Sequence, residues 1–524
     1  MHSITLKDVS KSHGARLLLD RVPLVVGAGS RIGLVGPNGI GKTTLLRLLA
    51  GLDAPDSGAI LRSPPTLTVG YLPQELDVRA GETLLAYLER RTGVTAAAEE
   101  MDALAARLPD AVAEYTEALE RFLALGGADL AARAAAACAE VGLGGRLDES
   151  LVTFSGGEAA RARLAALLLA RFEVLCLDEP TNDLDFAGLE LLERFVAGLR
   201  GSLVVVSHDR AFLDRTVTRI VEIEEGSGKL REWPGGWSDY EAARGRAREA
   251  QYHRFAETEE RRRELESLLR ERRGQARTGA TLAKRTGGAD RRGTHALQTK
   301  VRQAERALER LERVEKPFEP WRLQLSLAPK RRSGDVVVRL EGGVVERGSF
   351  RLGPLDLELR YGDRLAVTGP NGSGKTTLLR ALLGELSLVV GRRTLGRGVV
   401  VGTIDQRRGR FAGGRPVVEE FAAESGWTQG ETRTLLAKFG LGADDVLRPG
   451  RSLSPGERTR AALALAAARG VNCLVLDEPT NHLDLPAIEE LEAALETFEG
   501  TVVLVTHDRR LLERFRLTRE LALR

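Results

Sequence analysis

The stretch Gly36-Pro-Asn-Gly-Ile-Gly-Lys42-Thr43-Thr44 decides the fold, and it occurs again as Gly369-Pro-Asn-Gly-Ser-Gly-Lys375-Thr376-Thr377. Glycines at these positions allow successive backbone N–H groups to surround phosphate oxygens. The lysine can then reach the outer phosphates, and the threonine hydroxyl can bind Mg²⁺. Two such loops in one chain predict two nucleotide-binding halves of the α/β class.

The residues around each loop have the context that this motif requires. Apolar strands are expected at 31–35 and 364–368, and helices at 44–50 and 377–383. The loop residues predicted to bind nucleotide are Gly36, Asn38, Gly39, Gly41, Lys42, Thr43, Thr44, Gly369, Asn371, Gly372, Gly374, Lys375, Thr376 and Thr377.

Two further motifs repeat with a different spacing. Ser155-Gly-Gly-Glu158 matches Ser454-Pro-Gly-Glu457, and Asp178-Glu-Pro-Thr-Asn182 matches Asp477-Glu-Pro-Thr-Asn481, both at an offset of 454 − 155 = 299. The phosphate loops are offset by 375 − 42 = 333, so the second copy is shorter by 333 − 299 = 34 residues. Internal repeats of this kind indicate two copies of one fold.

The 34 extra residues lie between Gln74 and Ser155, because Gln406 matches Gln74 at an offset of 332. Helix-forming composition predicts helices at 96–108 and 110–125, with Pro109 as the break between them. This insertion is either an arm that contacts a partner or a larger helical subdomain without one.

Buried strands that end in polar residues predict the chemistry of the site. The strands at 174–178 and 474–477 end in adjacent carboxylates, Asp178-Glu179 and Asp477-Glu478. The aspartate is expected to hold Mg²⁺ through water, and the glutamate to orient or deprotonate an attacking water. His208 and His507 follow apolar strands at the same edge and are expected to contact the γ-phosphate.

These motifs resemble those of the ATP-binding cassette ATPases. The resemblance implies that the Ser-Gly-Gly-Glu signature of each cassette closes over the nucleotide of the other. One site would join Lys42, Thr43, Gln74, Asp178, Glu179 and His208 to Ser454, Gly456 and Glu457. The other would join Lys375, Thr376, Gln406, Asp477, Glu478 and His507 to Ser155, Gly156, Gly157 and Glu158.

The resemblance also assigns roles within these sites. Glu179, Glu478, His208 and His507 would be catalytic, and the Mg²⁺ sites would comprise Thr43, Gln74 and Asp178 in one half and Thr376, Gln406 and Asp477 in the other. Asp185 and Asp484 match the carboxylate that couples the two sites. ATP and Mg²⁺ are therefore the expected cofactors, and ATP hydrolysis at two composite sites the expected activity.

Three departures from the family pattern affect particular positions. His13 and Arg347 stand where cassettes often place an aromatic under adenine, which leaves the base selectivity open. Pro455 replaces a signature glycine and removes one N–H donor. Asp183 stands where the second copy has His482.

The segment between the copies has its own charge. A helix is expected from Ser238 to about Arg273, a glycine-rich tip at about 274–294 and a second helix at about 295–314. From Arg244 to Lys316 there are 21 basic and 12 acidic residues, a net charge of +9, whereas the whole chain carries only +3. A cationic hairpin suits phosphate backbones, although a solvated charged linker is the alternative. The expected RNA contacts are Arg277, Lys284, Arg285, Arg291 and Arg292.

Two cassettes, a helical insertion and a basic linker together resemble the ABC-F family. The fold that this resemblance implies is two α/β cassettes in tandem, at 1–237 and 317–524, joined by a hairpin linker at 238–316, with an arm inserted at about 85–130. The implied function is a translation factor that binds the ribosomal E site and directs its linker at P-site tRNA and the peptidyl-transferase centre.

The implied partners are the 50S subunit, 23S rRNA and P-site tRNA, and the chain would be a monomer whose two cassettes dimerise internally. Protection of the ribosome from 50S-targeting antibiotics is the preferred role, and rescue of stalled ribosomes is the alternative. A tandem ATPase subunit of a transporter and a DNA-repair ATPase are rivals of other classes. The latter is less favoured because the chain has no zinc-type CxxC module.

Composition sets outer limits on these interpretations. Hydrophobic residues make up 43% and charged residues 29% of the chain, so it is expected to fold into globular domains. The sequence has no apolar run of about 20 residues and no secretion-signal pattern at its start, so a cytoplasmic location is expected. The three cysteines, Cys138, Cys176 and Cys473, are expected to be reduced and structural.

Overall fold

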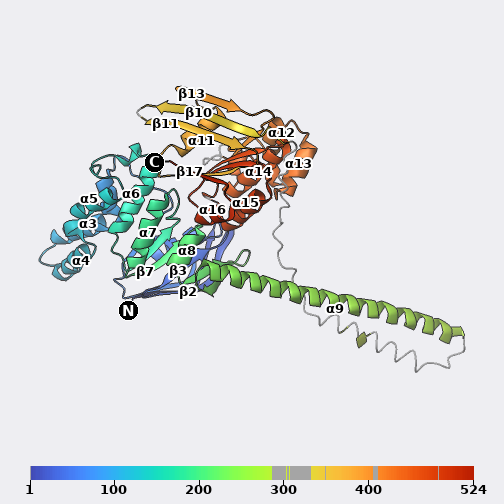
Figure 1. Cartoon of the computed structure of the whole chain (residues 1–524). Helices are drawn as coiled ribbons and strands as arrows, with labels where there is room; N and C mark the ends of the chain where they lie inside the picture. Colours follow the sequence, from blue (N-terminus) through green and yellow to red (C-terminus); the bar gives the residue numbers. More distant parts are fainter. Residues whose placement is uncertain are drawn as a thin grey trace. The chain divides into compact units, whose positions relative to one another are not determined.

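The computed structural model describes residues 2–285, 302–303, 306, 332–348, 350–404, 411–481 and 483–523. The chain divides into two compact units: unit 1 comprises Met1–Trp237 and Leu323–Arg524, and unit 2 comprises Ser238–Arg322. Within unit 1 we call residues 1–237 the first half and residues 332–523 the second half. Each half has one large sheet with helices packed against it and one small antiparallel sheet (Figure 1).

The first half contains seventeen α and β elements among the described residues. They are β1 (Ser3–His13), β2 (Arg16–Gly27), β3 (Arg31–Val35), α1 (Lys42–Ala50), β4 (Ser57–Ser63), β5 (Val69–Leu72), α2 (Leu84–Arg91), α3 (Val94–Ala105), α4 (Val112–Ala124), α5 (Leu130–Glu140), α6 (Gly156–Leu169), β6 (Val174–Asp178), α7 (Phe186–Gly198), β7 (Ser202–Val206), α8 (Arg210–Thr216), β8 (Arg219–Ile223) and β9 (Leu230–Pro234). Short 3₁₀ helices lie at Gly127–Asp129 and Leu151–Thr153.

The second half repeats this order without the inserted helices. Its elements are β10 (Val336–Arg347), β11 (Phe350–Arg360), β12 (Arg364–Thr368), α11 (Lys375–Leu383), β13 (Val390–Leu395), β14 (Val401–Ile404), α12 (Val417–Ser425), α13 (Gln429–Lys438), α14 (Pro455–Arg469), β15 (Cys473–Asp477), α15 (Leu485–Thr497), β16 (Thr501–Val505), α16 (Arg509–Arg514) and β17 (Arg519–Ala522). Short 3₁₀ helices lie at Asp445–Leu447 and Gly450–Ser452.

Sheet topology brings the predicted site residues to one edge. The large sheet of the first half has the order β5-β6-β7-β3-β8-β9, and that of the second half has the order β14-β15-β16-β12-β17. Strands β6, β7 and β3 are parallel neighbours, as are β15, β16 and β12. The segments that follow these strands therefore meet at the carboxyl edge of each sheet, where ligands bind in open α/β folds.

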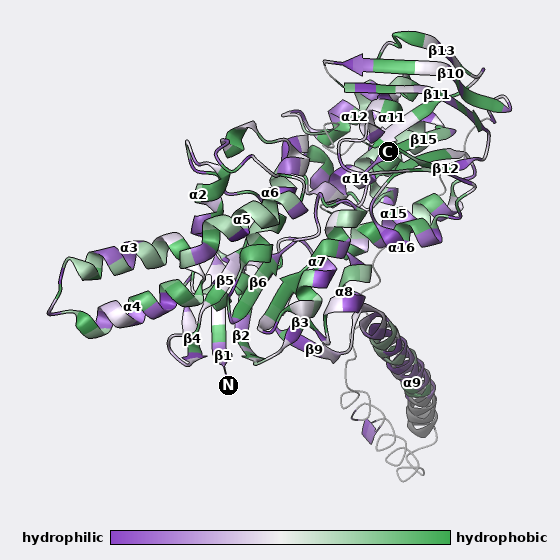
Figure 2. Ribbon diagram, turned by 60° about the vertical axis from the view of Figure 1, so that its left-hand side comes forward, coloured by the Kyte–Doolittle hydropathy of each residue, from purple (hydrophilic) through white to green (hydrophobic). Residues whose placement is uncertain are grey.

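The central strands form because they can be buried on both faces. Every residue of β6 and of β7 is buried, and so is every residue of β15 and of β16. Continuous apolar runs of this kind are typical of parallel strands covered by helices on both sides. Figure 2 shows β6 and β3 mostly in the hydrophobic colour. The predicted strands at 31–35 and 364–368 are confirmed as β3 and β12.

The extra residues of the first half form the predicted helical pair. Helices α2 and α12 begin 417 − 84 = 333 residues apart, whereas α5 and α13 begin 429 − 130 = 299 residues apart. The 34 additional residues thus lie between α2 and α5, where α3 and α4 pack against each other. The helices are shorter than predicted, because the turn between them extends from Ala106 to Ala111 rather than being a break at Pro109 alone.

Unit 2 begins with one long helix, α9 (Trp237–Arg285). The prediction that this helix ends at about Arg273 was wrong, because α9 continues twelve residues further, through Gly274 and Gly279. Each glycine costs about 1 kcal/mol inside a helix, and the intervening arginine, glutamine and alanine residues are good helix formers that offset the cost. Of the second predicted helix, only residues 302, 303 and 306 are described, and all three are helical; the remainder lies outside the described residues.

Two further expectations concern membranes and cysteines. No helix in the described part of the chain has both the length and the apolar composition of a membrane span. Two consecutive helical segments, Val112–Ala124 and Gly127–Glu140, reach that length and composition only when taken together, and the chain bends by 50° between them. All three cysteines are free and buried, as predicted. Burial raises the pKa of the Cys176 thiol to about 12, which keeps it protonated and unreactive.

Candidate nucleotide-binding sites

Both phosphate loops lead into helices whose N-terminal N–H groups are not capped by a side chain. Gly41 and Gly374 precede α1 and α11 with φ angles of 117° and 97°, and only glycine adopts such values without strain. Neither position supplies a side chain that accepts hydrogen bonds from the first turn. These N–H groups and the helix dipole are therefore available to an anion, and binding of the nucleotide phosphates there stays a prediction.

The loop lysines are buried and fold back onto their own loops. Lys42 Nζ donates to the carbonyl oxygens of Gly36 at 2.6 Å and Pro37 at 3.1 Å. Lys375 Nζ donates to the matching carbonyls of Gly369 and Pro370 at 2.7 and 3.0 Å. Burial lowers the pKa of both ammonium groups, while the nearby glutamates Glu179 and Glu478 oppose that shift. A phosphate entering the loop would meet a cation that is already held in place.

The adjacent carboxylates lie at the ends of β6 and β15, as predicted. Thr376 Oγ1 donates to Asp477 Oδ2 at 2.7 Å, and Tyr71 Oη donates to Asp178 Oδ2 at 3.3 Å. A threonine hydroxyl beside a carboxylate is an oxygen donor set that fits Mg²⁺. Among the described residues no group of three or more His, Cys, Asp or Glu side chains could hold a metal by itself, so remaining ligands would have to come from phosphate and water.

The two predicted catalytic glutamates have a strained backbone. Glu179 and Glu478 have φ angles of 49° and 47°, in the left-handed region that non-glycine residues rarely adopt. Their N–H groups donate to Val206 and Val505 on the neighbouring strands, each at 2.9 Å, which holds this conformation. Strain of about 1–3 kcal/mol per residue is typical of functional sites.

Burial also sets the protonation of these glutamates. It raises the pKa of both the Glu179 and Glu478 carboxyls to about 8, with the neighbouring aspartates adding to the shift and the loop lysines opposing it. His208 Nε2 lies 3.2 Å from Glu179 Oε1, and His507 Nε2 lies 3.3 Å from Glu478 Oε1. Burial and the Lys375 charge lower the pKa of His507 to about 4, so this imidazole is neutral at pH 7.

A rise in activity with pH follows from these values. A glutamate with a pKa of about 8 is mostly protonated at pH 7 and becomes a competent base as the pH rises. We expect kcat/KM for ATP hydrolysis to increase about tenfold between pH 7 and pH 9. A kcat/KM that is flat from pH 6 to pH 9 would contradict this assignment.

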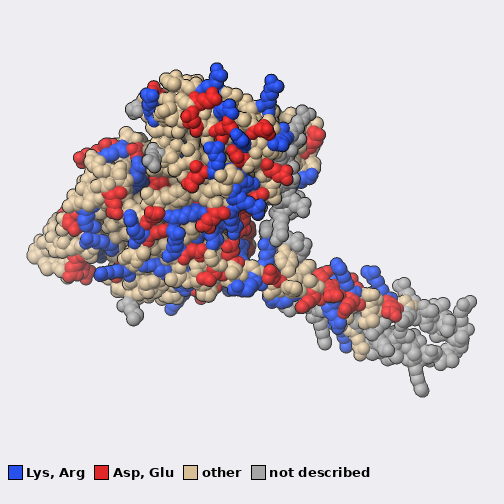
Figure 3. Space-filling view, in the orientation of Figure 1, with Lys and Arg blue, Asp and Glu red and all other residues tan. Residues whose placement is uncertain are grey.

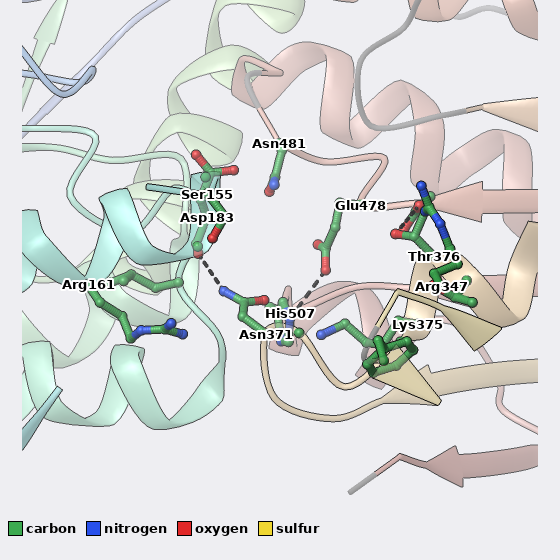
Figure 4. Close-up of a pocket in the computed structure, with 18 of the residues that line it drawn as sticks. Ser155, Arg161, Asp183, Arg347, Asn371, Lys375, Thr376, Glu478, Asn481 and His507 are labelled. Atoms are coloured by element: carbon green, nitrogen blue, oxygen red, sulfur yellow. Dashed lines mark hydrogen bonds and ion pairs between the residues drawn. The ribbon is translucent and has the colours of Figure 1, made fainter. Parts of the chain in front are cut away.

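One cavity lies between the two halves, with a volume of 1160 Å³. Its walls combine the signature of the first half with the phosphate loop and carboxylate of the second. The lining residues are Ser155, Gly156, Gly157, Arg161, Asp183, Leu184, Arg347, Gly348, Phe350, Asn371, Gly372, Gly374, Lys375, Thr376, Thr377, Asp477, Glu478, Asn481 and His507. Figure 4 shows Ser155 and Arg161 on one side and Lys375, Thr376 and His507 on the other. The structure thus brings together residues predicted for one composite site.

Contacts between the halves occur at both phosphate loops. Asp185 Oδ2 accepts a hydrogen bond from the Asn371 N–H at 2.9 Å, and Asp484 Oδ2 accepts one from the Asn38 N–H at 3.1 Å. Asn371 Nδ2 also donates to the Asp183 carbonyl oxygen at 2.8 Å. The two aspartates additionally cap the N-termini of α7 and α15, so each joins a helix of one half to the loop of the other.

The signature glutamates also have a local role, for which the Ser-x-x-Glu spacing is the sequence signal. The Glu158 carboxylate accepts from the Ser155 N–H at 2.7 Å, and the Glu457 carboxylate from the Ser454 N–H, closing capping boxes at α6 and α14. Their predicted contacts with nucleotide stay predictions. Pro455 is the first residue of α14, where its missing N–H costs little because that group has no partner within the helix.

Phe350 and Arg161 are among the cavity residues that were missed from the sequence. Phe350 begins β11, and its ring would lie 2.7 Å from a Cβ added at Gly374, so it borders the phosphate loop directly. Phe350 pairs with Arg347 across the β10–β11 hairpin. In the first half, the matching hairpin of β1 and β2 pairs His13 with Arg16, so an arginine stands where the second half has the aromatic residue. Arg161 extends from α6 of the other half. An aromatic residue about twenty positions before the loop could have indicated Phe350.

Some predicted residues lie outside the described part of the chain. Gln406, His482, Arg291 and Arg292 are among them. Arg277, Lys284 and Arg285 belong to α9, but nothing is described of their side chains. Gln74 is described, and its carbonyl oxygen accepts a hydrogen bond from Arg163 Nη1.

The fold and the shared cavity define a tandem ATP-binding cassette protein. A family model described as "ABC transporter" matches residues 19–182 and 352–481. Among solved structures, RNase-L Inhibitor superimposes with a TM-score of 0.60 over 98% of this chain and 86% of its own, at 20% identity, which shows the fold alone.

Curated relatives narrow this class. The tylosin resistance ATP-binding protein TlrC of Streptomyces fradiae is 38% identical, covering 98% of this chain and 96% of its own. The energy-dependent translational throttle protein EttA of Mycobacterium tuberculosis is 33% identical, covering 97% and 89%. ABC transporter F family member 5 of Arabidopsis thaliana is 32% identical, covering 97% and 73%. The chain belongs to the ABC-F family.

Proposed function

We propose that this chain is a cytoplasmic ATPase that binds the ribosome and protects it from antibiotics that act on the 50S subunit. The observation that carries this proposal is unit 2, which starts with a 49-residue helix and continues into a strongly basic segment. At about 1.5 Å per residue such a helix spans about 74 Å, which suits reaching into a large assembly.

The positive charge of the linker is concentrated away from the start of α9. From Arg244 to Glu271 there are eight basic and seven acidic residues, a net charge of +1. From Arg272 to Lys316 there are thirteen basic and five acidic residues, a net charge of +8. In the first segment, pairs such as Arg261–Glu264 and Arg262–Glu259 lie about one turn apart on the helix. Figure 3 shows basic and acidic side chains intermixed along the described part of the long helix. The second segment is the part suited to phosphate backbones.

The two composite sites would power this binding. In each half the buried glutamate would accept the proton of the attacking water and the histidine would contact the γ-phosphate, while the loop lysine binds the outer phosphates. Mg²⁺, held by Thr43 and Asp178 with Gln74, and by Thr376 and Asp477 with Gln406, would neutralise phosphate charge. The signature serine and glycines of the opposite half would complete each site only when the halves close.

On the ribosome, we propose that the closed ATP-bound chain occupies the E site. The basic linker residues, including Arg277, Lys284, Arg285, Arg291 and Arg292, would face P-site tRNA, 23S rRNA and the peptidyl-transferase centre. The helices α3 and α4 would form an arm that contacts the ribosome near the L1 stalk. Support comes from the charge distribution above and from the names of two relatives, one a tylosin resistance protein and the other a translational throttle protein.

Drug susceptibility of a host that expresses the chain tests the protective role. We expect higher inhibitory concentrations of drugs that bind the peptidyl-transferase centre or the exit tunnel, because the linker would reach their sites. A variant lacking residues 274–294 should lose this protection while keeping ATPase activity. Unchanged susceptibility to every such drug would favour the alternative, rescue of stalled ribosomes.

A further inference from the structure

A pair of ion-pair clusters joins the two halves beside the nucleotide sites. Arg210 of α8 donates two hydrogen bonds to the carboxylate of Glu492 on α15, one of them at 3.1 Å. Arg509 of α16 donates to Glu193 Oε1 on α7 at 2.6 Å. Each bond crosses from one half to the other, over sequence separations of 282 and 316 residues.

The two clusters are copies of each other in the internal repeat. Each glutamate also accepts a hydrogen bond from an arginine of its own half: Glu492 from Arg514 at 2.8 Å and Glu193 from Arg215 at 2.9 Å. The offsets 509 − 210, 492 − 193 and 514 − 215 are all 299. This is also the offset of the signatures and of the carboxylate strands. The same arginine and glutamate positions of the repeat therefore form both clusters, with the arginine of each half bound to the glutamate of the other.

The Arg210–Glu492 cluster is linked to the phosphate loop and to the histidine segment of the first half. Asp484 caps the N-terminus of α15 and accepts a hydrogen bond from the Asn38 N–H of the first phosphate loop, and Glu492 lies eight residues further on. At about 1.5 Å per residue, these two contacts are about 12 Å apart along one rigid helix. Arg210 is two residues after His208, and Asp209 between them caps α8. Helix α15 therefore bridges the phosphate loop and the histidine segment of the opposite half.

Burial distinguishes the arginines that cross between the halves from those that do not. The side chains of Arg210 and Glu492 are 1% and 7% exposed, and those of Arg509 and Glu193 are 16% and 15% exposed. Arg514 and Arg215 are 52% and 56% exposed. Interactions between desolvated groups are strong, and loss of one partner is costly, whereas exposed pairs contribute little.

We infer that Arg210 and Arg509 are positioning residues that hold the halves closed through Glu492 and Glu193 and thereby couple the two nucleotide sites. This inference rests on the proposed ATP-driven closure but not on the ribosome as partner. When the halves separate, each glutamate keeps the arginine of its own half and loses the one from the other half. The crossing arginines thus stabilise the closed state selectively, and binding of ATP at one site favours completion of the other.

Closure of the purified chain in ATP tests the inference. The native cysteines are buried, so cysteines introduced at the exposed residues Val152 and Val389, one in each half, can carry a fluorescent donor and acceptor. Hydrolysis is blocked by Glu179→Gln with Glu478→Gln, and energy transfer is followed as ATP is added. We expect Arg210→Gln to raise the ATP concentration at half-closure by about tenfold and to make the transition less steep. Arg509→Gln should have a smaller effect, because its pair is more exposed.

The matched controls are Arg514→Gln and Arg215→Gln, which remove the partners from the same half. These variants remove the same charge beside the same glutamates, yet they should change the ATP concentration at half-closure by less than about twofold. Adding Glu492→Gln to Arg210→Gln should have little further effect, because the crossing bond is already lost. If Arg210→Gln fails to fold, as judged by urea unfolding, Arg509→Gln carries the test.

Equal midpoints for the crossing and non-crossing variants would overturn the inference. So would a loss of folding stability that accounts for the whole shift. If the unmodified chain closes in ATP but does not bind ribosomes, the proposed function fails and the coupling role of the arginines stands.

Discussion

The Glu179→Gln, Glu478→Gln double variant is expected to bind ATP and to hydrolyse it at least about a hundredfold more slowly than the unmodified chain. Glutamine has the size of the buried glutamates but cannot accept the proton of the attacking water. The substitution also removes two carboxyls whose burial raises the pKa to about 8, so folding should not suffer. Steady-state phosphate release measures the loss of hydrolysis, and ATP titration measures the retained binding.

If ATP closes the halves, this variant should stay closed. We expect it to co-sediment with 70S ribosomes in ATP and to block peptide synthesis in a cell-free system. The matched control is Glu140→Gln with Glu499→Gln, because both residues are exposed and the replacement of carboxyl by carboxamide is the same. Loss of ribosome binding in the double variant, with ATP still bound, would be decisive against the proposed function. Robust copurification with a membrane permease would instead support the transporter alternative.

Replacement of a phosphate-loop lysine by alanine is expected to weaken ATP binding by about a hundredfold or more. The lysine supplies charge-assisted hydrogen bonds to two phosphates, each contributing about 1.5–3 kcal/mol. In this structure Lys42 and Lys375 also tie two carbonyls of their own loop, so their loss removes the order of the loop before nucleotide arrives. Lys42→Ala and Lys375→Ala should each affect one site, which calorimetric titration can resolve as a change in stoichiometry.

The control for the lysine variants is Lys438→Ala, which removes the same charge from an exposed position at the end of α13. Its ATP affinity and stoichiometry should match those of the unmodified chain. Normal binding at two sites in the Lys42→Ala, Lys375→Ala double variant would mean that nucleotide is not held by these loops.

Much of each nucleotide site could be predicted from the sequence, because the relevant constraints are local. The loop before α1 needs glycines for its φ angles, and the strand before Asp178 needs a continuous apolar run to be buried on both faces. These requirements leave a pattern within about ten neighbouring residues. The internal offsets then placed the 34 additional residues between Gln74 and Ser155, the segment that contains α3 and α4, since an insertion shifts every later motif equally.

Other features depended on packing that no short pattern records. The length of α9 was underestimated because helix stability sums over many residues, and two glycines did not end it. Phe350 was missed because its place beside Gly374 is set by the β10–β11 hairpin and not by the loop motif.

The sequence by itself determined two repeated phosphate loops, their carboxylates and histidines, and the uneven charge of the linker. Only the tertiary structure decided which residues of one half meet the other, such as Arg210 with Glu492 and Asp185 with Asn371. The physical reason is that a motif is imposed by the backbone next to it, whereas these pairs depend on how two folded surfaces dock. The charges of Arg210 and Glu492 are ordinary in the sequence and become informative only because both side chains are buried where the two halves meet.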